Sequence, residues 1–262
     1  MRERGLDIFK LKLIAFTGTA MLFAAWSGII PSSLQWLRIL LGFLGSVSIP
    51  VISLVLSEAI KHTRSVTLYM VRLLVMAVLC AFPYFMIYHD PSSGFRFSDY
   101  LSGPFTVFYC VGILLIYNKL PYKWLKTGSV FMFVLISVFI GIEFAPVSVI
   151  MAYIVFIYSS EKERKFRDFN IILFSVAIGV VGGLFLFFGG TKLYNIDLVS
   201  LVSLSGCALA VPLLRLYSGS DNSFENKAVR FIAKYSFYFA YLMLTVGLAL
   251  LKYYVIASNA SA

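Results

Sequence analysis

The residues best suited to chemistry lie in the segment SEAIKHTRSVTLYMVRLL, where polar side chains stand between two apolar runs. Glu58 and His62 are four residues apart, so on a helix they share one face and can hydrogen-bond. Arg72 follows in the next apolar run and can face them across the turn. One interpretation is a polar pocket in which the carboxylate orients the histidine for proton transfer. The other, which the spacing alone favours, is an interfacial ion pair that anchors a helical hairpin.

Other polar groups point less clearly to chemistry. His89 lies in a loop with several charged residues and is interpreted as a solvated loop residue. The charged run 161–168 is most simply a cytoplasmic turn, although it can also attract a polyanion such as the phosphates of coenzyme A. The three cysteines show no metal-ligand or pairing spacing, so no metal site is predicted; they are Cys80, Cys110 and Cys207.

The composition indicates that these residues are positioned by helices in a membrane. The 262 residues are 60% hydrophobic and 13% charged, whereas a soluble domain carries about 25% charged residues. The net charge of +10 is explained by Lys and Arg at a cytoplasmic membrane surface, where they meet anionic lipid. Membrane lipid is therefore the expected partner, and nucleic acid is not.

The apolar runs predict an all-α polytopic transmembrane helical bundle of about nine helices, forming one integral membrane domain over residues 1–262. Their lengths approach the roughly 20 residues that cross a bilayer core, and none shows the period-two alternation of a barrel strand. The spans are 11–30, 39–56, 68–88, 104–117, 128–144, 145–158, 171–189, 198–214 and 235–256. Spans five and six meet near Glu143 and are interpreted as a tight hairpin rather than one kinked helix. Rows of small residues, such as Gly42 and Gly45 or Gly179 and Gly182, predict close helix packing.

The basic residues predict a cytoplasmic N-terminus. Positive charge is retained on the cytoplasmic side of a membrane protein. Eighteen of the 22 Lys and Arg residues fall in the N-terminal segment and alternate connections, and the other four are Arg38, Arg96, Lys192 and Lys252. Nine spans then place the C-terminus outside.

The same polar segment resembles the TraX family of membrane proteins, which are named for conjugal pilus work and include a member linked to pilin acetylation. The family pattern runs Gly-Arg-x-Ala-Phe-Pro, then Glu, then His-Thr, a Tyr and Arg-Leu. Its counterparts keep the family spacing and are Gly45 to Pro50, Glu58, His62, Thr63, Tyr69, Arg72 and Leu73. The first span also resembles the family opening, with Lys12 and Met21 as counterparts.

Three departures from the family pattern bear on chemistry. The Asp-His pair of the family's first span is replaced by Ala24 and Ala25, and a C-terminal His is replaced by Tyr241. Acetyl transfer needs a base and a way to stabilise the oxyanion, and alanine can supply neither.

The resemblance implies a bacterial inner-membrane protein of a pilus, conjugation or cell-surface modification system, with acetyl or acyl transfer from acetyl-CoA as the ancestral activity. Glu58 and His62 are then the catalytic candidates, and Arg72, Lys12 and Tyr69 the candidates for holding the cofactor. The acceptor is expected to be pilin or a surface glycan, and a homo- or hetero-oligomer is possible. The alternative is a non-catalytic TraX-like scaffold or partner subunit. A small-molecule permease is less favoured, because no span has paired Gly/Pro breaks in matching halves.

Overall fold

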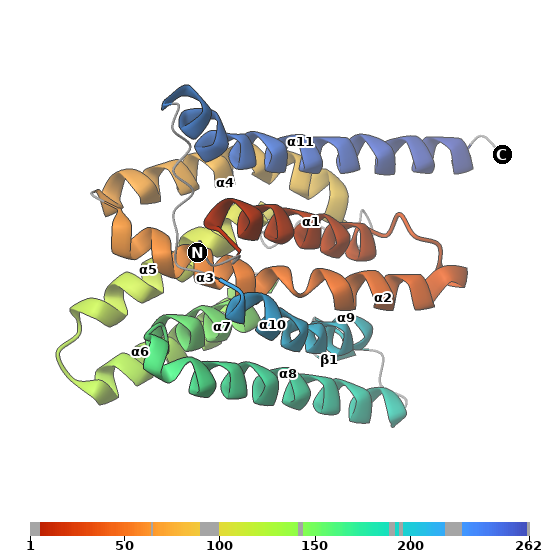
Figure 1. Ribbon diagram of the computed structural model, residues 1–262. Helices are drawn as coiled ribbons and strands as arrows, with labels where there is room; N and C mark the ends of the chain where they lie inside the picture. Colours follow the sequence, from red (N-terminus) through yellow and green to blue (C-terminus); the bar gives the residue numbers. More distant parts are fainter. Residues whose placement is uncertain are drawn as a thin grey trace. The chain divides into compact units, whose positions relative to one another are not determined.

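The computed structural model describes residues 6–63, 65–89, 100–140, 144–188, 192–193, 196–217 and 227–260. These residues are almost entirely helical (Figure 1). The chain divides into two compact units, each built from two stretches of sequence. The first unit comprises Met1–Val55 and Tyr158–Tyr241, and the second comprises Leu56–Ile157 and Leu242–Ala262. Helices α3, Ser48–His62, and α11, Lys227–Ala260, contribute residues to both units.

The first unit contains the N-terminal helices and a second group that follows Tyr158. In addition to its parts of α3 and α11, its helices are α1 (Ile8–Trp26), α2 (Gln35–Gly45), α8 (Arg164–Phe187), α9 (Leu198–Ser203) and α10 (Ala210–Arg215). Three short 3₁₀ helices are η1 (Ser32–Leu34), η4 (Glu161–Glu163) and η5 (Leu204–Leu209). Two-residue strands β1 (Lys192–Leu193) and β2 (Ile196–Asp197) pair antiparallel.

The second unit adds α4 (Val66–Tyr88), α5 (Gly103–Lys119), α6 (Lys123–Ile140) and α7 (Ala145–Ile157). Helices α4 and α5 pack together, as do α6 and α7. The Ser102 hydroxyl donates to the Ala77 carbonyl at 3.3 Å, and the Tyr100 ring stacks on Phe85 at 4.4 Å. The start of α5 therefore lies beside the C-terminal half of α4, and the two helices run antiparallel.

Local sequence explains where several helices begin and end. Asp7 caps α1 by accepting from the Lys10 amide at 2.8 Å, which satisfies one of the backbone donors that a helix start leaves open. After α1 the chain turns at Gly28, whose φ of +75° favours glycine. The Ser65 hydroxyl accepts from the Leu68 amide at 3.4 Å at the start of α4. Pro104 stands in the first turn of α5, where a missing amide hydrogen costs nothing.

The prediction that small residues permit close packing is confirmed within the first unit. A Cβ built on Gly45 would lie 2.7 Å from the Gly18 carbonyl oxygen, so α1 and α2 approach through their backbones. A Cβ on Gly206 would lie 1.9 Å from the Phe43 oxygen, which makes η5 fit against α2. The neighbouring Cys207 thiol donates to the Ser46 carbonyl at 3.3 Å. In the second predicted row, a Cβ built on Gly179 of α8 would lie 2.9 Å from the Ser205 Cβ atom of η5. Each predicted row thus contributes to a helix interface.

Six helical segments in the described part of the chain are long and apolar enough to cross a membrane. They are Ile8–Trp26, Gln35–His62, Val66–Tyr88, Lys123–Ile140, Glu161–Phe187 and Tyr235–Val255. The second of these contains a break, because α2 ends at Gly45 and α3 begins at Ser48. The predicted span 198–214 is likewise divided into α9, η5 and α10.

The predicted hairpin between spans five and six falls partly outside the described residues, since Glu143 is not among them. On either side, α6 and α7 are separate helices that pack against each other. Phe144, just before α7, has a φ of 61°. A left-handed residue stops a helix, and this arrangement agrees with a hairpin rather than one kinked helix.

Candidate functional site

Glu58 and His62 lie on one face of the last turns of α3, as their spacing requires. The His62 Nε2 atom is 3.4 Å from Glu58 Oε2, and the other Glu58 oxygen is 3.0 Å from the Lys61 ammonium. The Glu58 side chain is 17% exposed, whereas that of His62 is 71% exposed. The carboxylate can therefore orient the imidazole while leaving its outer edge open to a reactant.

The remaining candidates occupy different helices. Tyr69 and Arg72 lie in the first two turns of α4, and both are partly buried. They belong to the second unit with Glu58 and His62, but a role for Arg72 beside that pair stays a prediction. Lys12 belongs to the first unit, where its ammonium lies 5.9 Å from the centroid of the Phe237 ring. Such a contact is a cation–π interaction, and it places Lys12 of α1 against Phe237 of α11.

The positions that differ from the TraX pattern lie together in the first unit and are packed with apolar groups. Phe23, which precedes Ala24, contacts Tyr241 edge-to-face with ring centroids 5.6 Å apart. Ala25 is completely buried, and its carbonyl oxygen accepts from Arg38 Nε at 3.1 Å. These positions therefore contribute to the contact between α1 and α11.

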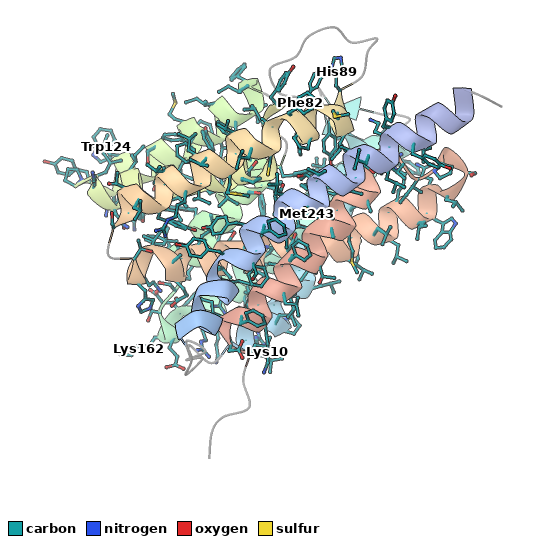
Figure 2. The ribbon with its side chains drawn as sticks, turned by 90° about the horizontal axis from the view of Figure 1, so that it is seen from above. Lys10, Phe82, His89, Trp124, Lys162 and Met243 are labelled. Carbon is teal, nitrogen blue, oxygen red and sulfur yellow. The ribbon has the colours of Figure 1, made fainter. Side chains whose placement is uncertain are left out.

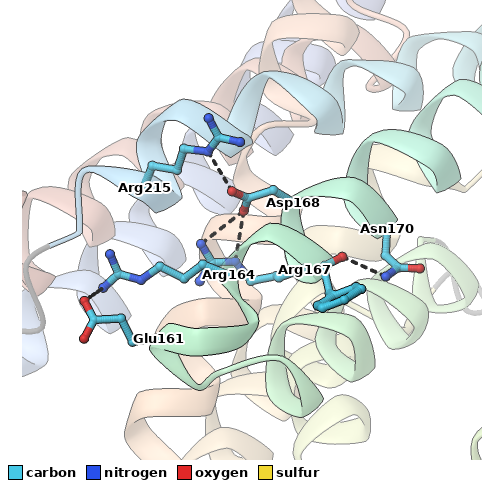
Figure 3. A network of polar contacts seen from close by, with 7 residues as sticks. Glu161, Arg164, Arg167, Asp168, Asn170 and Arg215 are labelled. Carbon is cyan, nitrogen blue, oxygen red and sulfur yellow. Dashed lines mark hydrogen bonds and ion pairs between the residues drawn. The ribbon is translucent and has the colours of Figure 1, made fainter.

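A buried ionic network at the start of α8 is the best-defined polar site in the described part of the chain (Figure 3). Asp168 is 2% exposed and Arg167 is 3% exposed. Asp168 Oδ1 accepts from Arg167 Nε and Nη2, both at 3.2 Å. Asp168 Oδ2 accepts from Arg215 Nε at 2.7 Å. The carboxylate therefore joins α8 to the end of α10.

The sequence analysis interpreted 161–168 as a charged cytoplasmic turn that can also attract a polyanion, and it did not single out Asp168. One usable signal is its place as the last charge before a long apolar run, because an ionisable group there is expensive unless paired. Its partner Arg215 is 47 residues away, a separation with no local periodicity. Only Glu161 and Arg164, whose charged atoms are 3.4 Å apart, behave as the exposed pair expected of a turn.

Several basic residues of the first unit lie at one end of its helices. The Leu6 amide donates to the Leu216 carbonyl at 2.7 Å, which holds the start of α1 against the end of α10. Asp168 holds the start of α8 at the same place. Lys10 and Lys162 accordingly lie toward the same end in Figure 2. Arg38 lies at the opposite end of α1, beside Ala25.

The second unit separates its charges in the same way. Because α4 and α5 are antiparallel, Lys119 at the end of α5 lies toward the start of α4. Lys252 donates to the Ile87 carbonyl at the other end of α4.

Among the residues that the structure describes, no group of three His, Cys, Asp or Glu side chains can hold a metal ion.

The outward faces of the long helices define the class of protein. Phe82 on α4, Trp124 on α6 and Met243 on α11 are among many large apolar side chains that are more than half exposed (Figure 2). Exposed apolar area on this scale is unfavourable in water but suits lipid. Together with the six bilayer-length segments, it indicates an integral membrane protein of helical type.

Comparison with protein families, curated proteins and solved structures finds no match for this chain.

Proposed function

We propose that the chain is a TraX-like protein of the bacterial inner membrane that transfers an acetyl or acyl group from acetyl-CoA in a pilus, conjugation or cell-surface modification system. The observation that carries this proposal is the 3.4 Å contact between His62 Nε2 and Glu58 Oε2 on the exposed end of α3. An imidazole held by a carboxylate is the usual general base for activating an amine or hydroxyl.

In the proposed reaction the acceptor nitrogen or oxygen attacks the thioester carbonyl of acetyl-CoA. His62 takes the proton of the attacking group. The carbon–sulfur bond then breaks, and the imidazolium returns the proton to the leaving thiolate, which releases coenzyme A. Glu58 stabilises the imidazolium that forms. Arg72 and Tyr69 are the proposed cofactor-binding residues of the second unit, where His62 also lies, since Arg72 is a cation suited to phosphate groups. Lys12 stays a cofactor-binding candidate from the resemblance alone. The acceptor is proposed to be pilin or a surface glycan.

The proposal includes nine membrane spans with a cytoplasmic N-terminus. It is supported by the separation of basic residues within each unit, with Lys10, Lys162 and Arg215 at one end of the first unit and Arg38 at the other. In a background that lacks the native cysteines, single cysteines at Lys123 and Arg164 should then be shielded from an impermeant thiol reagent in intact cells, while one at Ser93 should react. Labelling of the cysteine at Arg164 from outside would overturn the nine-span topology.

The activity is tested by measuring acetylation of the surface protein or glycan in cells that carry the wild type, His62→Ala, His89→Ala or a deletion. Loss of a general base lowers a rate by about a hundredfold to ten-thousandfold, so His62→Ala should resemble the deletion. His89 is the matched control, because it is the other histidine of the chain and stacks on Phe85 at 4.3 Å. If His62→Ala retains the modification that the deletion loses, His62 is not the base.

A second candidate function is a non-catalytic TraX-like scaffold or partner subunit. The contact of Phe23 with Tyr241 beside the buried Ala25 favours it, because apolar packing occupies the positions where the family has Asp and His. A scaffold predicts that the deletion lowers the amount of a partner protein in the membrane. It also predicts that His62→Ala restores that amount fully.

A further inference from the structure

We propose that the network around Asp168 builds a binding site for the headgroup of an anionic phospholipid, with Arg215 as the residue that contacts the phosphate. This proposal does not depend on acyl transfer. It rests on the charge balance of the network, the contact and exposure of Arg215, and the exposed apolar side chains that follow Arg215 and stand on the first turns of α8.

The network carries more positive charge than its acidic groups can balance. One buried carboxylate, Asp168, faces two guanidinium groups, those of Arg167 and Arg215. Arg164 precedes Asp168 by four residues and so lies on the same helical face, where Glu161 balances it at 3.4 Å. The first turn of α8 adds the partial positive charge of a helix start. The site therefore favours an anion.

Arg215 can hold Asp168 and a ligand at the same time. Its Nε atom donates to Asp168 Oδ2 at 2.7 Å, while its side chain is 62% exposed. In Figure 3 the dashed line from Arg215 to the carboxylate starts at Nε and not at either terminal nitrogen atom. A guanidinium offers five donors in a fixed plane, and its outer edge matches two phosphate oxygens. The buried Asp168 thus positions Arg215 in advance of binding.

The surroundings favour a lipid over a free nucleotide. Leu216, which follows Arg215, is 55% exposed. Phe166 and Phe169 on the first turns of α8 are 64% and 63% exposed. Exposed aromatic and apolar residues at the charged end of a long apolar helix are typical of the membrane interface, where acyl chains begin below the phosphate layer. Basic sites between transmembrane helices bind acidic lipid headgroups in this way.

The test is a lipid titration of the purified full chain in neutral detergent, followed by native mass spectrometry. Phosphatidylglycerol and phosphatidylcholine with the same acyl chains are compared, and the wild type should prefer the first. Arg215→Gln should lower the affinity for phosphatidylglycerol about fivefold, the usual effect of one basic residue near an anionic surface. Lys123→Gln is the matched control, because it removes one exposed positive charge from the second unit; it should bind as the wild type does.

Arg215→Lys separates a built site from general charge attraction. Lysine keeps the charge, but one ammonium cannot replace both the Nε contact to Asp168 and the outer edge of the guanidinium. This variant should therefore bind phosphatidylglycerol more weakly than the wild type, with an unchanged elution volume and melting temperature as evidence of folding.

Three results would overturn the proposal. Arg215→Lys or Arg215→Gln could bind phosphatidylglycerol as tightly as the wild type. Lys123→Gln could lose as much affinity as Arg215→Gln. Coenzyme A could displace the lipid at equal concentration, which would make a free phosphate group the occupant instead.

Discussion

Replacement of Asp168 by asparagine tests whether one buried carboxylate holds the end of the first unit together. The asparagine side chain would keep the size of the aspartate and remove its charge. The adjacent Arg167 is 3% exposed, so its guanidinium would stay buried beside a neutral amide. A buried charge that has lost its counter-charge is unfavourable because the low-dielectric interior does not solvate it.

The magnitude follows from the exposure of the two partners. Breaking a buried ion pair by removing one member costs about 3–5 kcal/mol, and this applies to Arg167. The contact with Arg215 adds little, because that side chain is 62% exposed and exposed pairs contribute about 0–1 kcal/mol. Asp168→Asn should therefore lower the free energy of unfolding by about 3 kcal/mol or more.

The assay is equilibrium unfolding of the purified chain in mixed micelles with increasing denaturing detergent. Glu161→Gln is the matched control: it removes one carboxylate from the same turn, but its side chain is 83% exposed and its partner Arg164 is 39% exposed. Its effect should stay below about 1 kcal/mol. A double variant, Arg167→Met with Asp168→Leu, should recover most of the lost stability, since apolar residues often replace a buried ion pair without cost.

Equal destabilisation by Asp168→Asn and Glu161→Gln would refute this reasoning, because the carboxylate would then be solvated rather than buried. A double variant less stable than Asp168→Asn would also contradict it. That result would mean that the arginine contributes packing that methionine cannot supply.

Two further predictions concern packing. Gly206→Ala should greatly lower the yield of folded protein, because its Cβ would lie 1.9 Å from the Phe43 carbonyl oxygen. Gly183→Ala, with no atom within 4 Å of its built Cβ, should instead gain about 0.5–1 kcal/mol of stability from a better helix former. Thermal unfolding followed by size-exclusion chromatography compares the two variants, and equal yields would contradict the close approach at Gly206. The native cysteines are all at most 3% exposed; they are Cys80, Cys110 and Cys207. A small maleimide should therefore modify them only after unfolding, with the number of modified residues counted by intact-mass spectrometry. Rapid labelling of the folded chain would show that these thiols are not buried.

The sequence by itself determined the helices and the contacts that lie within one helix. Apolar runs of bilayer length have few stable conformations other than helix in lipid, because every backbone donor and acceptor must be satisfied within the segment. Because an α-helix has a regular geometry, the four-residue spacing of Glu58 and His62 was enough to predict that their side chains meet. In the structure His62 Nε2 lies 3.4 Å from Glu58 Oε2. The break between α2 and α3 was missed, since apolarity alone does not locate a turn inside a long run.

Contacts between distant helices were decided only by the tertiary structure. Asp168 and Arg215 are separated by 47 residues, and nothing in the sequence near either one specifies the other. The meeting of Phe23 with Tyr241 likewise requires α1 and α11 to pack side by side in the first unit. Helical periodicity predicts on which side of its helix a side chain lies. Which other helix packs against that side depends on how closely the two helix surfaces can approach. Glycines such as Gly45 and Gly206 set that distance here, and their effect appears only when the opposing backbone is in place.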